Sequence, residues 1–191
     1  MKTFVYMVRH GDSPKEGKER VRGLSETGLI DVQRVTEILK REGIQTIVSS
    51  PYRRAVLTVE PIANTIGEEV AILEDLKERV FSSEENRVDD KQLMPLLEKS
   101  FEDKYYTLEG GESNADCQHR AVAVLREIVR TFSGQKIAIG THGAVMTLMM
   151  GYFDEKYNSL KFLHSTTKPD IYRMEFEGER LVGVDRLWPP L

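Results

Sequence analysis

Short apolar runs alternate with segments of helical periodicity along most of the 191-residue chain. Four of the apolar runs predict strands, at residues 3–8, 46–49, 70–73 and 136–140. The last of these is apolar after its first residue, Lys136, which is typical of a buried parallel strand. The runs are too short to cross a membrane or to form the apolar part of a signal peptide, so the cytoplasm is the expected location.

The segments between these runs carry apolar residues at the spacing of an amphipathic helix. Ser25 is expected to cap the first helix, and Gly43 stands where its C-terminus favours a glycine. The second helix follows residues 50–51 and should be kinked by Pro61. Ser113 is expected to cap a third, long helix, and a Met-rich helix is predicted at residues 144–150. Strand–helix alternation of this kind predicts an α/β fold, a three-layer αβα sandwich around a mostly parallel sheet.

Two regions depart from the alternation. Residues 79–112 are polar and charged with a short apolar set, and predict a small helical insertion that acts as a lid. Residues 171–176 and 180–187 predict a terminal hairpin across Glu177 and Gly178. The chain is therefore expected to form a single domain over residues 1–191, a length that can bury a core without disulfides.

Composition narrows the classes of partner. The formal net charge is −4 and the pI about 5.7, whereas binding to nucleic acid or to an anionic membrane favours a basic face. The single cysteine, Cys117, excludes an intrachain disulfide. Neither nucleic acid nor a membrane is expected as a partner, and whether the protein is a monomer or a homodimer stays open.

Polar residues with the chemistry of an anion site follow two predicted strands. His10 and His142 follow the predicted strands 3–8 and 136–140, each after one intervening residue, and Gly143 after the second histidine lets backbone approach a ligand. Arg9 precedes the first histidine, and Arg53 lies in the first turn of a helix, where backbone N–H groups favour an anion. Parallel strands present their carboxyl ends at one edge, so these groups are expected to converge on a phosphate.

The chain resembles the histidine phosphatase superfamily, which includes the cofactor-dependent phosphoglycerate mutases. The resemblance rests on six short segments in the family's order, which span nearly the whole chain: Val8-Arg9-His10-Gly11-Asp12-Ser13, Leu24-Ser25-Glu26-Thr27-Gly28, Ser49-Ser50-Pro51-Tyr52-Arg53-Arg54-Ala55, Leu76-Lys77-Glu78-Arg79, Gly110-Gly111-Glu112-Ser113 and Gly140-Thr141-His142-Gly143.

This resemblance implies a mechanism. His10 would attack phosphorus and become a phosphohistidine, while Arg9, Arg53 and His142 hold the phosphoryl oxygens. Glu78 matches the family's general acid and would protonate the leaving oxygen. No metal or other cofactor is implied, and the partner is a small phosphorylated substrate.

Several assignments stay open at this stage. Glu84 and Glu85 lie near Glu78 and are alternative acids. Ser13 is a possible hydroxyl donor to phosphate, and Gly143 a backbone contact. Arg54 is interpreted as a surface or structural cation beside Arg53.

Departures from the family pattern favour a phosphatase over a mutase. The stretch from Asp12 to Gly23 is short, Glu16 stands about where mutases carry an asparagine, and Phe81 replaces a tyrosine that mutases often use. A mutase must hold its phosphoglycerate and exclude water, which a short loop makes harder. Arg20 and Arg22 in this loop raise the hypothesis that a cation meets a second acidic group of the substrate.

Three other functions remain as alternatives. A phosphoglycerate mutase-type phosphotransferase is disfavoured by the short loop. A metal-dependent hydrolase lacks the expected ligand spacing around His10 and His142. A non-catalytic protein that binds phosphorylated ligands would not need the complete set of catalytic residues. The sequence therefore predicts a metal-independent phosphomonoesterase.

Overall fold

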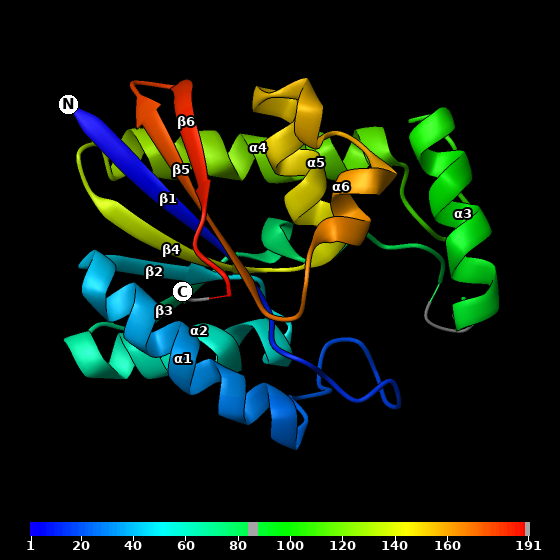
Figure 1. Cartoon of the computed structure of the whole chain (residues 1–191). Helices are drawn as coiled ribbons and strands as arrows, with labels where there is room; N and C mark the ends of the chain where they lie inside the picture. The colour runs from blue at the N-terminus through cyan, green and yellow to red at the C-terminus, as the bar shows by residue number, and fades with distance from the viewer. Residues whose placement is uncertain (84–87, 190–191) are drawn as a thin grey trace.

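The computed structural model describes residues 1–83 and 88–189 and contains a six-stranded sheet in the order β3-β2-β4-β1-β5-β6. The strands β3, β2, β4 and β1 pair in parallel, and β5 and β6 add antiparallel pairs beyond β1 (Figure 1). The predicted α/β fold is confirmed, with a mostly parallel sheet. The strands are β1 (Lys2–Arg9), β2 (Thr46–Ser49), β3 (Val70–Ile72), β4 (Lys136–Thr141), β5 (Asp170–Glu177) and β6 (Arg180–Arg186).

Helices cover both faces of the sheet, as the three-layer prediction requires (Figure 1). Alternate residues of β1 point to opposite faces: Val5 and Met7 pack with the helices α4 (Asn114–Thr131) and α5 (Gly143–Phe153). Tyr6 and Val8 pack with the helices α1 (Glu26–Glu42) and α2 (Arg53–Ile66) on the other face. The period-2 geometry of a strand therefore places β1 between two apolar cores.

The helix boundaries follow the predicted caps. The Ser25 side chain accepts a hydrogen bond from the Gly28 N–H, and Gly43 ends α1 with a φ of 74°. Ser113 and Asp116 form a reciprocal capping box at the start of α4. α2 continues through Pro61 as one helix, and the kink expected there stays a prediction. Local capping chemistry thus fixes where these helices begin and end.

The insertion predicted at residues 79–112 contains the helix α3 (Asp90–Glu102), which packs beside α5 and α6 (Leu160–Ser165). Leu97 of α3 lies in a small apolar cluster with Ala144 and Leu163, and Phe81 packs against it. The insertion therefore rests on the start of α5, the helix that follows His142.

The sequence missed the short elements. The 3₁₀ helices η1 (Glu74–Leu76) and η3 (Glu155–Tyr157), and the short helix α6, had no periodic signal long enough to predict them.

The terminal hairpin β5–β6 is confirmed. Among the described helices, none combines the length and apolar character needed to cross a membrane. The single-domain organisation stays a prediction.

Candidate active site

The two predicted histidines meet because their strands are neighbours. β1 and β4 pair in parallel with Arg9 opposite Thr141, so both strands end at the same edge of the sheet. The next residues are His10 and His142, whose ring centroids lie 5.2 Å apart. The prediction that parallel strand ends bring these side chains together is confirmed.

Hydrogen bonds define the protonation of His10. Its Nδ1 lies 2.7 Å from the Gly11 carbonyl oxygen, and because a carbonyl can only accept, Nδ1 carries the proton. Nε2 accepts a hydrogen bond of 3.2 Å from the Arg54 Nε–H. The neutral imidazole therefore presents its lone pair at Nε2, on the side of Arg54.

His142 is held from two sides. Its Nε2 lies 2.7 Å from the Ser50 hydroxyl, and the Tyr52 ring packs edge-on against the imidazole at a centroid distance of 5.1 Å. Within the described part of the chain, its buried Nδ1 has no hydrogen-bond partner. One ring nitrogen is thus occupied by the protein and the other remains available to a ligand.

Both imidazoles are buried and electrically neutral. Only 4% of His10 and none of His142 is exposed. Burial lowers the pKa of His10 well below its usual range, and the Arg54 guanidinium lowers it further. Burial has the same effect on the pKa of His142, again with a contribution from Arg54. A neutral histidine keeps the lone pair that a nucleophile needs.

These lowered pKa values predict acid sensitivity of the fold. In the unfolded chain the two histidines take up protons below about pH 6.5, whereas in the folded protein they stay neutral. The free energy of unfolding is therefore expected to fall as the pH drops below about 6.5, by about 1.4 kcal/mol per pH unit for each neutral histidine. Urea denaturation between pH 7.5 and 5 measures this slope.

Two variants provide the comparison. His10→Gln removes one of the two groups and is expected to make the pH dependence shallower. His119→Gln changes an exposed histidine of α4 and serves as the matched control variant. Parallel curves for the wild type and His10→Gln would contradict the neutral, buried state of His10.

Arg54, and not the predicted Arg53, is the arginine of α2 that lies at the site. Arg53 begins α2 and is exposed, whereas Arg54 is only 2% exposed and contacts His10. The expectation that Arg53 faces the site and Arg54 the surface is therefore wrong. The physical reason is helical phase, because position 54 lies on the same stripe as the buried Thr58 and Ile62.

Arg54 is itself held in place by the loop before α1. Its Nη1 donates to the Glu19 carbonyl at 2.7 Å, and its Nη2 forms an ion pair with the Glu19 carboxylate at 2.9 Å. The guanidinium also lies over the Tyr52 ring, 5.0 Å from its centroid. These contacts orient the Nε–H toward His10.

Arg9 lies beside the start of α5. Its Nη1 donates to the Thr166 hydroxyl at 2.5 Å, while its buried Nε has no partner within the described residues. A Cβ at Gly143 would come within 2.7 Å of Arg9 Nη2, so only glycine lets the guanidinium lie against this helix. Arg9 and Gly143 thus lie against each other, and the contact of both with a phosphate stays a prediction.

Glu78 also lies at the start of α5. Its Oε1 accepts from the Val145 N–H at 2.8 Å and its Oε2 from the Ala144 N–H at 3.1 Å. The carboxylate therefore occupies the N-terminus of the helix that directly follows His142, an end that favours negative charge. The alternative acids Glu84 and Glu85 lie outside the described residues.

The loop between β1 and α1 is tied together by its own side chains. The Ser13 hydroxyl donates to the Gly23 carbonyl at 2.6 Å and accepts from Arg22 at 2.9 Å. Arg20 pairs with Glu74, and Arg22 also pairs with Glu19. The proposed donation from Ser13 to a phosphate and the role of the two arginines in substrate binding stay predictions.

Sequence reasoning missed three contributors. Arg54 could have been found from the buried stripe of α2, whereas Ser50 and Thr166 give no local signal because their partners are more than 90 residues away. Across residues 1–83 and 88–189, no group of three or more His, Cys, Asp or Glu side chains could hold a metal ion.

The site contains two histidines, two arginines and one glutamate, and a comparison of the sequence with protein-family models gives a match. The model of the histidine phosphatase superfamily (branch 1) matches residues 5–185. The chain belongs to this superfamily. The matched residues include Arg9, His10, Arg54, Glu78 and His142.

Two plant proteins are among the relatives of this histidine phosphatase. The Arabidopsis thaliana phosphoglycerate mutase-like protein 4 is 29% identical over 154 residues, which cover 74% of this chain and 67% of that protein. The metal-independent phosphoserine phosphatase of the same plant is 30% identical over 156 residues, 75% of this chain and 66% of that protein. The matched region thus spans about two thirds of each plant protein.

Solved structures of phosphatases share the fold. A mycobacterial glucosyl-3-phosphoglycerate phosphatase superposes with a TM-score of 0.78 at 18% identity, covering 97% of each chain. The phosphoserine phosphatase of Entamoeba histolytica, solved with 3-phosphoglyceric acid, has a TM-score of 0.78 at 22% identity and covers 94% of each chain. The relatives together support phosphatase activity for this member of the superfamily.

Proposed function

We propose that this protein is a metal-independent phosphomonoesterase that hydrolyses a small phosphorylated metabolite through a phosphohistidine on His10. The observation that carries the proposal is the hydrogen bond from His10 Nδ1–H to the Gly11 carbonyl. It leaves the Nε2 lone pair as the nucleophile beside the Arg54 guanidinium. Nucleophile and anion-binding cation are thus adjacent, as phosphoryl transfer requires.

In the first step, the Arg54 Nε–H turns from His10 Nε2 to a phosphoryl oxygen. The freed Nε2 lone pair forms a bond to phosphorus while the bond from phosphorus to the leaving oxygen breaks. Glu78, protonated when the negatively charged phosphate is bound beside it, gives its proton to that oxygen, and the alcohol departs. Arg9, Arg54 and the free Nδ1 side of His142 stabilise the negative charge on the phosphoryl oxygens. His10 keeps the Nδ1 proton on the Gly11 carbonyl throughout.

In the second step, water attacks the phosphohistidine. The Glu78 carboxylate accepts a proton from the water as its oxygen bonds to phosphorus, and the P–Nε2 bond breaks. Inorganic phosphate leaves, and His10 is again neutral. Each turnover therefore returns both His10 and Glu78 to their starting protonation states.

The relatives guide the choice of substrate. Proteins named for action on phosphoserine and on glucosyl-3-phosphoglycerate are among the similar ones, so a panel of phosphorylated acids and sugars is the first screen. Release of phosphate from one compound with a much higher kcat/KM than the rest would identify the substrate. Exchange of phosphate between positions of phosphoglycerate without release would favour the mutase alternative.

The general acid is tested by the leaving group. Glu78→Gln is expected to lower kcat/KM for an alkyl phosphate by about 10²- to 10⁴-fold, because a basic leaving oxygen needs its proton in the first step. For p-nitrophenyl phosphate, whose leaving group is already stable as an anion, the loss should be much smaller. Equal losses on both substrates would indicate that a different group is the acid.

Chelation tests the absence of a metal requirement. Dialysis against a strong chelator is expected to leave kcat/KM within about twofold of the untreated enzyme, since side chains alone supply the proposed charge stabilisation. Loss of activity that returns on adding a divalent cation would contradict the proposal. Phosphate release from the wild type, with the His10→Ala protein as blank, is the measurement.

A further inference from the structure

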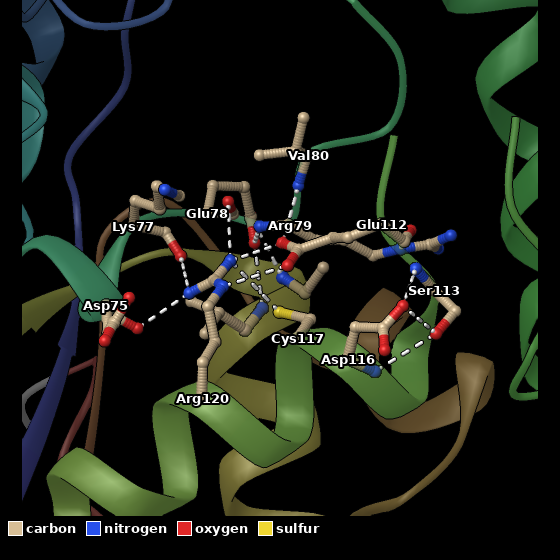
Figure 2. A network of polar contacts seen from close by, with 12 residues as sticks. Asp75, Lys77, Glu78, Arg79, Val80, Glu112, Ser113, Asp116, Cys117 and Arg120 are labelled. Atoms are coloured by element: carbon tan, nitrogen blue, oxygen red, sulfur yellow. Dashed lines mark hydrogen bonds and ion pairs between the residues drawn. The ribbon is translucent and has the colours of Figure 1, made fainter. Parts of the chain in front are cut away.

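A network of polar contacts surrounds the segment that carries Glu78, and Figure 2 shows it from close by. Its centre is Arg120, which lies on α4 six residues before Arg126. The Arg120 side chain is 14% exposed and that of its partner Glu112 17%. Neither residue touches His10, and the two-step mechanism above does not use them.

Arg120 binds three backbone carbonyls of one segment. Its Nη1 donates to the Asp75 carbonyl at 2.7 Å and to the Lys77 carbonyl at 3.0 Å. Its Nη2 donates to the Glu78 carbonyl at 3.2 Å. One planar guanidinium thus holds the chain on the N-terminal side of Glu78 and at Glu78 itself.

Glu112 holds the chain on the other side. Its carboxylate forms an ion pair with Arg120, and its Oε1 also accepts from the Val80 N–H at 2.9 Å. The Glu112 N–H in turn donates to the Val80 carbonyl at 2.8 Å. The backbone of Glu78 is therefore fixed both at its own carbonyl and two residues later.

The fixed backbone determines where the Glu78 carboxylate lies. The carboxylate meets the N–H groups of Ala144 and Val145 at the start of α5. The same helix follows His142, so a shift of the Glu78 backbone would move the acid relative to the phosphate-binding histidine. A displacement of about 1 Å in a catalytic group can cost about 10²-fold in rate.

We infer that Arg120, neutralised by Glu112, is the positioning residue for the proton transfer by Glu78. The inference rests on the proposed function, in which Glu78 is the general acid and base. Arginine is needed because its fork of N–H donors reaches three carbonyls and a carboxylate at once. A lysine could keep the ion pair with Glu112, yet its single ammonium cannot replace that geometry.

The test compares kcat/KM for p-nitrophenyl phosphate with kcat/KM for an alkyl phosphate such as glycerol phosphate, because this constant reports the step in which the leaving oxygen departs. The ratio of these values does not depend on the fraction of folded enzyme, so a destabilised variant still reports on proton transfer. Arg120→Met and Arg120→Lys are both expected to raise this ratio by about 10- to 100-fold, in the same direction as Glu78→Gln.

Two further variants complete the design. Arg126→Met removes an arginine of the same helix whose ion pair with Glu179, at 2.6 Å, lies away from Glu78, and the ratio is expected to stay at the wild-type value. In the double variant Glu78→Gln with Arg120→Met, the ratio is expected to equal that of Glu78→Gln alone, because no acid remains to be positioned.

The outcomes separate this inference from the proposed function. If Glu78→Gln changes the ratio and Arg120→Met does not, Arg120 is structural and the inference is overturned while the mechanism stands. If Arg120→Lys restores the wild-type ratio, charge rather than geometry acts, and the positioning role is again overturned. If Glu78→Gln leaves the ratio unchanged, the acid assignment fails and the inference fails with it.

Discussion

Replacing His10 by alanine is expected to abolish turnover, with kcat falling by at least about 10⁴-fold, because alanine has no lone pair to take the place of Nε2 as nucleophile. Acid labile and base stable phosphate should accumulate on the wild-type enzyme during turnover and be missing from the variant. Rapid quenching with labelled substrate, followed by peptide mapping, measures both properties.

Two controls accompany this prediction. His119→Ala changes an exposed histidine on α4 and is expected to retain wild-type activity. A circular dichroism spectrum and a urea midpoint show whether the His10→Ala protein is folded. Label found on a serine or on Cys117, or full activity of His10→Ala, would refute the phosphohistidine mechanism.

The second large effect is expected on kcat/KM when one of two adjacent arginines, Arg53 and Arg54, is replaced. Arg54→Ala is expected to lower kcat/KM by about 10²- to 10³-fold, the typical cost of losing one donor to a developing oxyanion. Arg53→Ala should change kcat/KM by less than about twofold, since this side chain is exposed at the start of α2. Steady-state kinetics on p-nitrophenyl phosphate give both values under one set of conditions.

A conservative variant separates charge from geometry at this position. Arg54→Lys keeps the cation but removes the Nε–H that meets His10. It is expected to recover only part of the activity, because a lysine cannot bind two phosphoryl oxygens as a fork. An Arg53→Ala protein as impaired as Arg54→Ala would show that the stripe of α2 has been assigned to the wrong face.

The fold and the position of the histidines could be predicted because both depend on local, periodic signals. Residues 137–140 are apolar throughout, and Ser113 stands directly before a long amphipathic pattern, so strand and helix follow from the chain itself. The rule that parallel strands share their carboxyl edge then brings His10 beside His142 without any knowledge of side-chain contacts.

The remaining contacts depend on information that no short segment contains. A neighbouring pair such as Arg53 and Arg54 looks equivalent in a motif, and only the helical phase decides which one is buried. The Arg120–Glu78 carbonyl contact joins residues 42 positions apart in the chain and leaves no periodic trace. A polar residue in an amphipathic helix suggests solvent exposure, whereas Arg120 is largely enclosed by the backbone that it binds.

The sheet order has a consequence for how this enzyme acquires activity during synthesis. β1 carries the nucleophile at its end, yet its two neighbours in the sheet, β4 and β5, begin 127 and 161 positions after residue 9. A nascent chain that has reached only β3 has no partner for β1 and no second histidine. The active site can therefore form only after β4 has been synthesised, because β4 pairs with β1 and is followed by the second histidine. Until then β1 has no strand to pair with.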